Sequence, residues 1–278
     1  MTVTGDPPTA RTVTLRGLAA VVLPASGLLL AVGAWWLMAL HDPITVPTPD
    51  AVLQNLRGNF FTSPYLEAHG LNAGKGYWYD LLYTVQNVLL GVALGTCLGV
   101  GIGLISIPFP AVSDVLNPLF ATFGAAPIFV AAPFFLIWFG IVSSAQVIMV
   151  AFYTTVLMYI FSRRAAENVS REYLEAASSF GANGRQVFWR VYLPATIPEL
   201  IGGFRIALAG AWGLEAIAEL LGAQRGIGFL INYYSEVYGL VGMLTLTFLL
   251  GCAAIVCDAI AMFGARSLVR WTATGKVA

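Results

Sequence analysis

The longest uncharged stretch of this chain, residues 115–162, contains no Asp, Glu, Lys or Arg. A membrane-spanning helix needs about 20 apolar residues to cross roughly 30 Å of hydrocarbon, so this stretch is long enough for two spans. We place the break between them near the sequence FGIVSS at 139–144. The mean hydropathy of the whole chain is +0.80, which is too apolar for a water-soluble domain of this length. The predicted fold class is therefore an all-α integral membrane protein.

Four further apolar runs are long enough to span a bilayer. The first, 18–40, is too long for the apolar region of a signal peptide and is followed by no clear small-residue cleavage site, so we interpret it as an uncleaved span. The others are 81–107, 196–221 and 239–265. Together with the two spans in the uncharged stretch they predict six transmembrane helices, which places both termini on one side of the membrane.

The positions of the cations predict which side that is. Eleven Lys and Arg residues lie in segments on the side of the termini, and three lie on the other side, namely Arg57, Lys75 and Arg225. By the positive-inside rule the termini are cytoplasmic. This makes 1–17 and 271–278 cytoplasmic tails. It also makes 41–79 an extracytoplasmic segment, in which PTPDAVLQNLRGNF reads as a surface helix that begins after Thr48 and places Val52, Leu53, Leu56 and Phe60 on one face.

The segment 163–195 is a polar island between apolar spans and is predicted to be a cytoplasmic loop. In its two halves apolar side chains recur at helical spacing, first at Tyr173, Ala176, Ala177 and Phe180 and then at Val187, Phe188, Val191 and Tyr192. Between them the sequence GANG, 181–184, is able to end a helix and to turn the chain through left-handed conformations. We expect Pro194 to end the second helix and Pro198 to open the next span. The pattern alone leaves open whether these helices lie on lipid headgroups, on their own bundle or on another protein.

The sequence EAASSFGANGRQVFWRVYLP, 175–194, resembles the EAA loop of ATP-binding-cassette importer permeases. That loop reads Glu-Ala-Ala, three residues, Gly, nine residues, and then an aliphatic residue, any residue and Leu-Pro. The matching residues here are Glu175-Ala176-Ala177, Gly181 and Val191-Tyr192-Leu193-Pro194, with Val191 where isoleucine is commoner. The segments APFFLIWFGI, IAELLGAQRGIGFLI and ITVPTPDAVLQNL resemble the branch of these permeases that imports nitrate, sulfonates, taurine and similar small solutes.

The resemblance implies a type I importer permease fold, with a permease domain over 80–270, a bent coupling loop over 163–195 and the first span as an accessory helix. It implies a pathway between two permease subunits, with self-pairing usual in this branch, and an extracytoplasmic binding protein that delivers a small organic solute. It also implies two cytoplasmic ATPase subunits, each of which receives one loop. The coupling residues are then Glu175, Ala176, Ala177, Ser178, Phe180, Gly181, Ala182, Leu193 and Pro194.

The same resemblance predicts what the chain does not do by itself. It has no Gly-rich Lys-Ser/Thr phosphate loop, so ATP and Mg²⁺ are expected on the partner ATPase, with no cofactor in this chain and no enzyme activity. Its three cysteines lie in apolar runs without metal-ligand spacing, so no metal site is predicted. The expected location is the bacterial cytoplasmic (inner) membrane, in contact with lipid and with no nucleic-acid partner.

Within the spans, the glycines at 91, 95, 99 and 103 lie four apart on one helix face, a pattern typical of close helix packing. Two carboxylates, Glu215 and Glu219, share a face of the fifth span. A charge at the bilayer centre costs about 2.5–3.5 kcal/mol on insertion scales, so they either line the pathway or form hydrogen bonds between helices, with exposure among the headgroups as a further alternative for Glu219. For Asp258 we favour a hydrogen-bonding role.

The third span supplies the remaining candidates for the pathway. Pro127 and Pro133 have no N–H to donate, so backbone carbonyls one turn earlier lose their partners, which is tolerated where a helix faces protein or water. Trp138 belongs to a group of aromatic side chains in the same span. Related importers commonly carry an arginine three residues before the first of these prolines, where this chain has Gly124. That departure argues against a simple anion as the solute. The predicted pathway residues are Gly124, Pro127, Pro133, Trp138, Glu215 and Glu219.

Two other classes of protein are weighed against the importer. An ion-coupled secondary transporter would use the intramembrane carboxylates and usually shows internal repeats, and no clear repeat is present. A membrane-embedded enzyme would need a catalytic constellation, and no catalytic residue is recognised. Neither class has a need for the bent loop.

Overall fold

The computed structural model describes residues 10–268; residues 1–9 of the predicted N-terminal tail and the whole predicted tail 271–278 lie outside this range. Within it the chain is mostly helical, with an isolated bridge between Thr62 and Lys75 and no strand. The elements are α1 (Ala10–His41), α2 (Pro49–Asn59), α3 (Pro64–Ala68), η1 (Asn72–Gly74), α4 (Tyr77–Ile105), α5 (Pro110–Ala125), α6 (Ile128–Phe139), α7 (Ser143–Glu167), α8 (Arg171–Ser179), α9 (Gly184–Val187), η2 (Phe188–Tyr192), α10 (Leu193–Leu220), α11 (Ile227–Glu236) and α12 (Leu240–Leu268).

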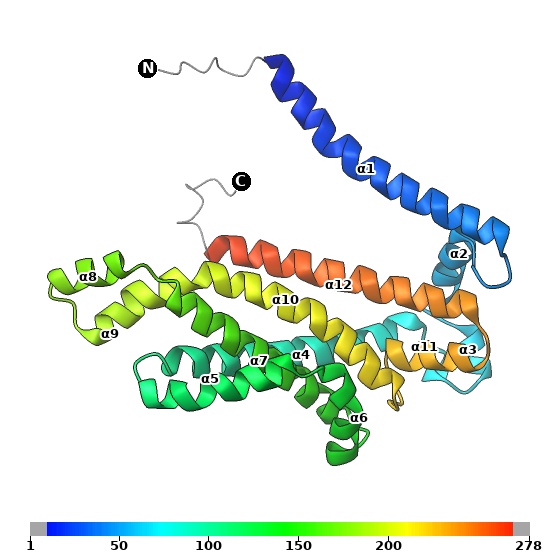
Figure 1. The fold of residues 1–278 in the computed structure, drawn as a ribbon. Coiled ribbons are helices and arrows are strands. Elements are labelled where there is room, and N and C mark those ends of the chain that lie inside the picture. The colour runs from blue at the N-terminus through cyan, green and yellow to red at the C-terminus, as the bar shows by residue number, and fades with distance from the viewer. Residues whose placement is uncertain (1–9, 269–278) are drawn as a thin grey trace.

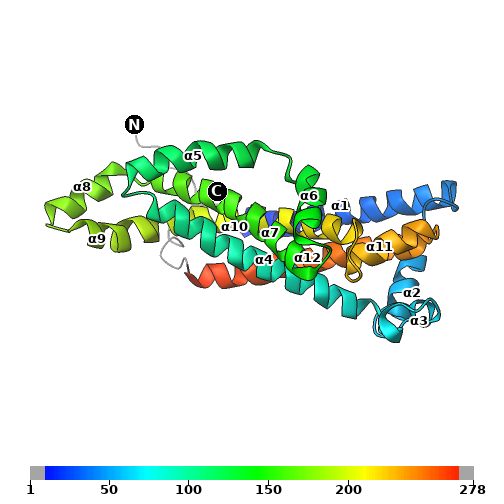
Figure 2. The same cartoon turned by 90° about the horizontal axis from the view of Figure 1, so that it is seen from below.

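The molecule is an elongated helical bundle with two different ends (Figures 1 and 2). The long helices α4, α7, α10 and α12 run along it, and α8 and α9 project beyond them at one end. The short helices α2, α3 and α11 gather at the opposite end. Helix α12 ends toward the α8–α9 end. Followed backward from His41 near the α2 end, helix α1 diverges from the rest of the bundle, so that its described start lies about midway along the molecule and apart from it.

The expected count of six spans stays a prediction, because the described residues contain four clear spans and a possible fifth. Four helices are long and apolar enough to cross a membrane: Tyr77–Ile105, Ser143–Glu167, Gly184–Leu220 and Leu240–Ala265. The pair α5 and α6 makes a fifth only if it counts as one span bent by 100°. The first predicted span falls within the 32-residue helix α1, whose apolar part Ala25–His41 is not among these four.

The third predicted span is broken where the sequence analysis placed no break. Ala126, between α5 and α6, adopts an extended backbone (φ −72°, ψ 136°) and is followed by Pro127. A residue before proline is pushed out of the helical region, and proline itself has no N–H to donate, so the helix ends here. The predicted break near 139–144 is also present: α6 ends at Phe139, the next residue Gly140 has a φ of +83°, and α7 begins at Ser143.

The expectation that Pro194 ends one helix and Pro198 opens the next is wrong. The helix that begins at Gly184 continues to Leu220 as one 37-residue unit. It passes through the π-helical element η2, where the N–H of Leu193 donates to the carbonyl oxygen of Phe188, five residues back. Proline is tolerated here because Pro194 falls next to this local widening, a place where the ordinary i→i−4 ladder is already interrupted.

Helices α4 and α7 form the closest pair in the bundle. A Cβ placed on Gly99 would lie 2.5 Å from the carbonyl oxygen of Thr155, and one on Gly91, Gly95 or Gly103 would also meet atoms of α7 at distances that real atoms do not tolerate. The backbones approach this closely only because these four positions have no side chain.

The segment 41–79, predicted to be extracytoplasmic, contains more helix than the one surface helix expected. Helix α2 begins after Thr48, as predicted, and packs against α12, but Leu53, which was expected on its apolar face, is exposed. Beyond α2 the segment contains the short helix α3, whose first turn is capped by the Ser63 hydroxyl accepting from the N–H of Leu66. A serine followed by proline is a helix-start signal, which the sequence analysis did not use.

Candidate functional site

The bend between α8 and α9 is built from glycine and two local capping motifs. Gly181 has a φ of +77°, the left-handed conformation that costs a side chain-bearing residue about 1–2 kcal/mol. The N–H of Ala182 donates to the carbonyl oxygen of Ala177 at 3.0 Å, and that of Gly181 to Ser178 at 2.9 Å. This pair of bonds is a Schellman motif, so the carbonyls at the end of α8 are satisfied without help from the rest of the protein.

The start of α9 is capped in a reciprocal manner. The Asn183 side chain accepts from the backbone N–H of Gln186, and the Gln186 side chain accepts from the backbone N–H of Asn183, both at 2.9 Å. Such a capping box satisfies two otherwise unpaired N–H groups. The sequence GANG therefore specifies both the end of one helix and the start of the next. The bend needs no tertiary contact to form.

The outer face of α8 presents apolar side chains that no described residue covers. Tyr173 and Ala176 are exposed, Ala177 is partly buried, and the ring of Phe180 is 92% exposed. Glu175 lies beside them and forms no ion pair within residues 10–268. Leu193 and Pro194, in contrast, are partly buried within the continuous helix, away from the bend. An apolar face at the tip of a membrane protein needs a protein or a headgroup layer to cover it.

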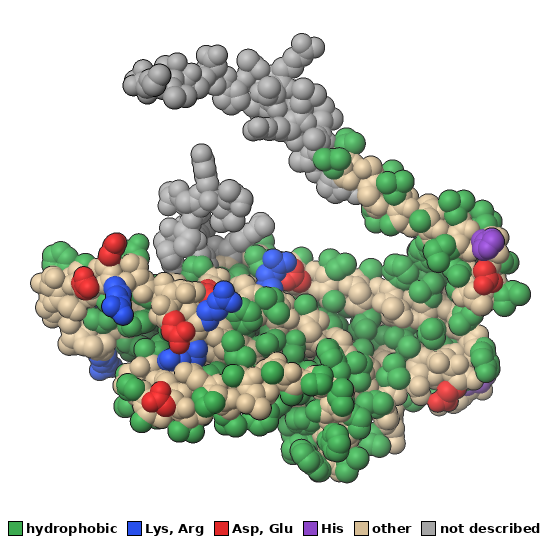
Figure 3. All heavy atoms as spheres, viewed as in Figure 1, with side chains coloured by type: hydrophobic (Ala, Val, Ile, Leu, Met, Phe, Trp, Pro, Cys, Tyr) green, Lys and Arg blue, Asp and Glu red, His purple; other side chains and the backbone are tan. Residues whose placement is uncertain are grey.

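Charged side chains gather at this same end. Figure 3 shows Lys, Arg, Asp and Glu over α8, α9 and the adjoining helix ends, while hydrophobic side chains dominate the middle of the molecule. Within the loop region, Arg163 pairs with Glu167 at 3.3 Å and Arg164 with Glu199 at 3.5 Å. These exposed pairs are typical of a water-facing surface and contribute little to stability.

A second cluster of polar residues lies inside the bundle, at the end of α10 opposite the bend. Glu219 is buried, and its two oxygens accept from the Thr84 hydroxyl at 2.7 Å and from the backbone N–H of Gly228 at 2.8 Å. The Thr84 oxygen accepts in turn from the N–H of Ile227, and Asp80 accepts from the N–H of Gly226. Side chains from α4 and α10 thus satisfy the first N–H groups of α11, which anchors that helix to both.

Glu215, one turn earlier on α10, belongs to a separate set of hydrogen bonds. Its side chain is buried and accepts from the Asn87 amide at 2.8 Å, while its second carboxylate oxygen is buried without a partner among the described residues. Asn87 also donates to Gln146 and accepts from Ser143. This set joins α4, α7 and α10.

These contacts bear on the alternatives for the two carboxylates. The alternative in which Glu219 is exposed among the lipid headgroups is wrong, because the residue is only 1% exposed. The geometry of both residues is that of hydrogen bonding between helices within one subunit. The partners on α4, namely Asp80, Thr84 and Asn87, were missed in the sequence, although polar residues at the start of an apolar span are a usable signal.

The other predicted pathway residues are not brought together with these carboxylates. Gly124 lies on α5 beside Ile160 of α7, and Pro127 and Pro133 belong to the start and the interior of α6. Trp138 is exposed on α6, whereas Glu215 and Glu219 bond to α4. A shared role for the six residues stays a prediction.

Replacing Glu219 with glutamine is expected to destabilise the protein more than the same change at Glu215. If the amide nitrogen faces Gly228, the buried N–H of Gly228 loses its acceptor, which costs about 1–3 kcal/mol. If it faces Thr84, it must donate to the hydroxyl oxygen that already accepts from the N–H of Ile227. Glu215→Gln keeps the oxygen that accepts from Asn87. The melting temperature of the detergent-purified protein, followed by size-exclusion fluorescence, is the measurement. Equal melting temperatures for the two variants would contradict this account.

The fold and these two sites define a multi-pass helical membrane protein with an exposed bend at one end and, among residues 10–268, no recognisable catalytic centre. The chain matches, over residues 95–274, the family described as binding-protein-dependent transport system inner membrane component. Because this match spans well over half of the chain, the protein belongs to that family. Members are permease subunits of ATP-binding-cassette transporters and not enzymes, and a partner ATPase hydrolyses ATP in these systems.

Individual relatives agree with this assignment. The chain is 28% identical over 221 residues to the taurine transport system permease protein TauC of Escherichia coli (strain K12), covering 78% of this chain and 77% of that one. It is 37% identical over 98 residues to the putative aliphatic sulfonates transport permease protein SsuC of the same organism, covering 35% and 37%. It is 29% identical to the formylaminopyrimidine transport permease protein ThiX of Halalkalibacterium halodurans over 185 residues, covering 64% and 74%.

Solved structures show the same fold. The inward-facing MetNI methionine ABC transporter superposes with a TM-score of 0.58 at 18% identity, covering 70% of this chain and 94% of that chain. An amino acid ABC transporter superposes with a TM-score of 0.55, also at 18% identity, covering 70% and 92%. The type I importer permease fold predicted from the sequence is confirmed, as is a multi-pass location in the inner membrane. The ion-coupled secondary transporter is no longer an alternative.

Proposed function

We propose that two copies of this chain form the translocation pathway of an importer for a small organic solute. In this proposal the α8–α9 bend of each copy inserts into a surface cleft of one cytoplasmic ATPase subunit. An extracytoplasmic binding protein delivers the solute at the end that carries α2, α3 and α11. ATP and Mg²⁺ bind to the ATPase subunits, and this chain contributes no residue to hydrolysis.

The observation that carries this proposal is the uncovered apolar face of α8 on a bend that forms by itself. Phe180 stands at the tip with its ring in solvent, and Gly181 fixes the direction in which α9 leaves. The small side chains of Ala176 and Ala177 permit close approach of a partner, and Glu175 is free to accept charge-assisted hydrogen bonds. Ser178 and Ala182 carry the Schellman bonds, so they act by shaping the bend.

Orientation follows from charge. Apart from Arg205, which lies within α10, the cations counted for this side fall in the terminal segments and around the α8–α9 end, which supports a cytoplasmic position for this end and for both termini. The relatives' names mention taurine, aliphatic sulfonates and formylaminopyrimidine. These are small polar organic molecules, and a solute of this size class is proposed here.

Removing the exposed ring at the tip of the bend tests the docking. We expect Phe180→Ala to weaken retention of the ATPase subunits by about tenfold or more, because aromatic side chains at the centre of an interface commonly contribute 2 kcal/mol or more. Co-purification of the ATPase subunits with the tagged permease from membranes is the measurement. The amount of inserted permease should not change.

The matched control is Phe61→Ala. Phe61 is likewise an exposed aromatic residue, but it lies in the α2–α3 segment at the opposite end of the molecule. It should retain the ATPase subunits as the wild type does. Full retention in Phe180→Ala, or equal loss in both variants, would refute docking through the bend.

A further inference from the structure

An ion pair lies exposed near the middle of two membrane-spanning helices. Arg205 of α10 donates from Nε to Asp258 Oδ1 of α12 at 2.9 Å and from an Nη nitrogen to Oδ2 at 2.8 Å. The two side chains are 49% and 34% exposed. Lipid tails offer no hydrogen bonds and disfavour charge by several kcal/mol, so this surface must face water or protein.

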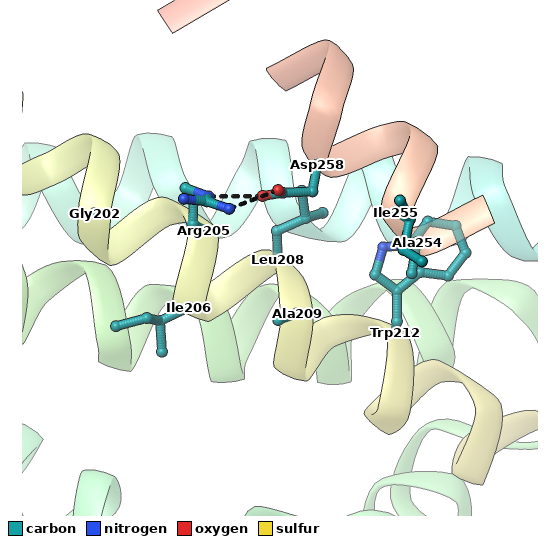
Figure 4. Close-up of a pocket in the computed structure, with 9 residues that line it drawn as sticks. All are labelled: Gly202, Arg205, Ile206, Leu208, Ala209, Trp212, Ala254, Ile255 and Asp258. Atoms are coloured by element: carbon teal, nitrogen blue, oxygen red, sulfur yellow. Dashed lines mark hydrogen bonds and ion pairs between the residues drawn. The ribbon is translucent and has the colours of Figure 1, made fainter. Parts of the chain in front are cut away.

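The pair borders a groove of about 520 Å³ between α10 and α12. Figure 4 shows the pair at one end of the groove and the Trp212 ring, beside Ala254 and Ile255, at the other, with Leu208 between them. Gly202 and Ala209 also line the groove, and their small size leaves space for a solute. A volume of this size is in the range of small-molecule sites.

Two hydrogen-bonding groups in the groove have unused capacity. Arginine has five N–H donors, and two of them engage Asp258, which leaves three without a partner among residues 10–268. The indole N–H of Trp212 is buried and has no acceptor within the same described residues. Of these two groups only Arg205 is accessible from the groove, so the groove offers the Arg205 donors for an anionic group and, in Asp258, an acceptor for a cationic group.

The charge balance of the groove indicates which solutes fit. The charges of Arg205 and Asp258 cancel. A solute with a single negative charge is therefore attracted by Arg205 and repelled by Asp258 at a similar distance. A small zwitterion meets both with opposite charges and keeps the groove neutral.

We propose that the α10–α12 groove is a solute site in the translocation pathway and that its Arg205–Asp258 pair selects small zwitterions over singly charged molecules of the same size. This inference rests on the proposed function, since it needs the groove to face the pathway. A second permease copy that simply covers the pair is the outcome that overturns it.

The first test asks whether the groove is accessible to water and to water-soluble reagents. Ala209→Cys, in a permease whose Cys97, Cys252 and Cys257 are replaced by serine, should react with a charged methanethiosulfonate reagent in the reconstituted permease–ATPase complex. Leu94→Cys, an exposed apolar position of α4, should stay unreactive against lipid. If Ala209→Cys stays unreactive both with and without ATP, protein or lipid covers the groove and the proposal fails.

The second test asks what the groove binds. Taurine, a small zwitterion, should slow labelling of Ala209→Cys about tenfold at saturation, and isethionate (its anionic analogue) and ethanolamine (a cation) should have little effect. Asp258→Asn should shift protection to isethionate, and Arg205→Gln should shift it to ethanolamine. The exchanged pair Arg205→Asp with Asp258→Arg should restore the preference for taurine.

A purely structural ion pair would not reverse selectivity in this manner. Protection by no probe, or unchanged preferences in the single variants, overturns the proposal. Retention of the ATPase subunits by the same preparations is measured in parallel. If they are retained, a negative result at the groove leaves the proposed function intact.

Discussion

Gly181→Val is expected to abolish stimulation of ATP hydrolysis by the loaded binding protein while the permease still inserts in the membrane. The backbone at this position has a φ of +77°, which a β-branched residue occupies only at a cost of about 1–3 kcal/mol. The strain falls on the bend alone, since a Cβ at Gly181 meets nothing within 4 Å. The variant therefore redirects α9 relative to α8 without disturbing the spans.

The control for this experiment is Gly184→Val. Gly184 also has open space around its Cβ position, but its φ is not positive, so valine is tolerated at the first turn of α9. The measurement is ATP hydrolysis by the reconstituted complex with and without the binding protein loaded with the transported solute. Normal stimulation in Gly181→Val, or equal loss in both variants, would show that the left-handed bend is not needed for coupling.

The second large effect is expected at the contact between α4 and α7. Gly99→Leu places a Cβ 2.5 Å from a carbonyl oxygen of α7 and further atoms beyond it. Overpacking a close contact costs about 1–3 kcal/mol even in an adaptable core, and here the obstacle is backbone that cannot rotate away. We expect folded permease in the membrane to fall about tenfold or more.

Gly101 provides the comparison on the same helix. A Cβ there meets nothing within 4 Å, and leucine is the better helix former, so Gly101→Leu should accumulate as the wild type does. Size-exclusion chromatography of fluorescently tagged protein quantifies the folded fraction in each case. Similar yields for the two variants would mean that α4 and α7 are not held at the distance described here.

Local features of the sequence predicted local features of the structure well. The GANG bend is specified by residues adjacent in the chain, because Gly181 closes α8 and Asn183 caps α9, and such capping can be read from a few residues. The apolar runs likewise predicted the long helices, because length and hydropathy are properties of each run alone.

Proline positions were harder to interpret. Pro127 breaks the third span, whereas Pro194 and Pro198 lie within one continuous helix. The residue itself is the same in each case, and the outcome depends on whether the neighbouring backbone finds other hydrogen-bond partners. At Pro194 a π-helical turn supplies the alternative backbone hydrogen bond. Residue spacing in the sequence does not predict such a turn.

The polar contacts inside the bundle depend on distant residues. Glu219 meets Thr84 across 135 positions of the chain, and Arg205 meets Asp258 across 53. Periodicity identifies the face of a helix but not the face that packs against it. The carboxylates were therefore recognised as unusual, while their partners on α4 and the pairing of Arg205 became evident only in three dimensions.

The unbroken helix from Gly184 to Leu220 behaves as a lever. At 1.5 Å per residue its 37 residues extend about 55 Å, from the tip that bears the bend to the carboxylate that holds α11. A tilt of about 10° around the midpoint of a straight rod of this length moves its two ends about 5 Å in opposite directions. In the orientation proposed above, a push on the tip beside the bend would then reach the opposite end of α10 as an opposite displacement, to the extent that the π-helical element η2 does not flex.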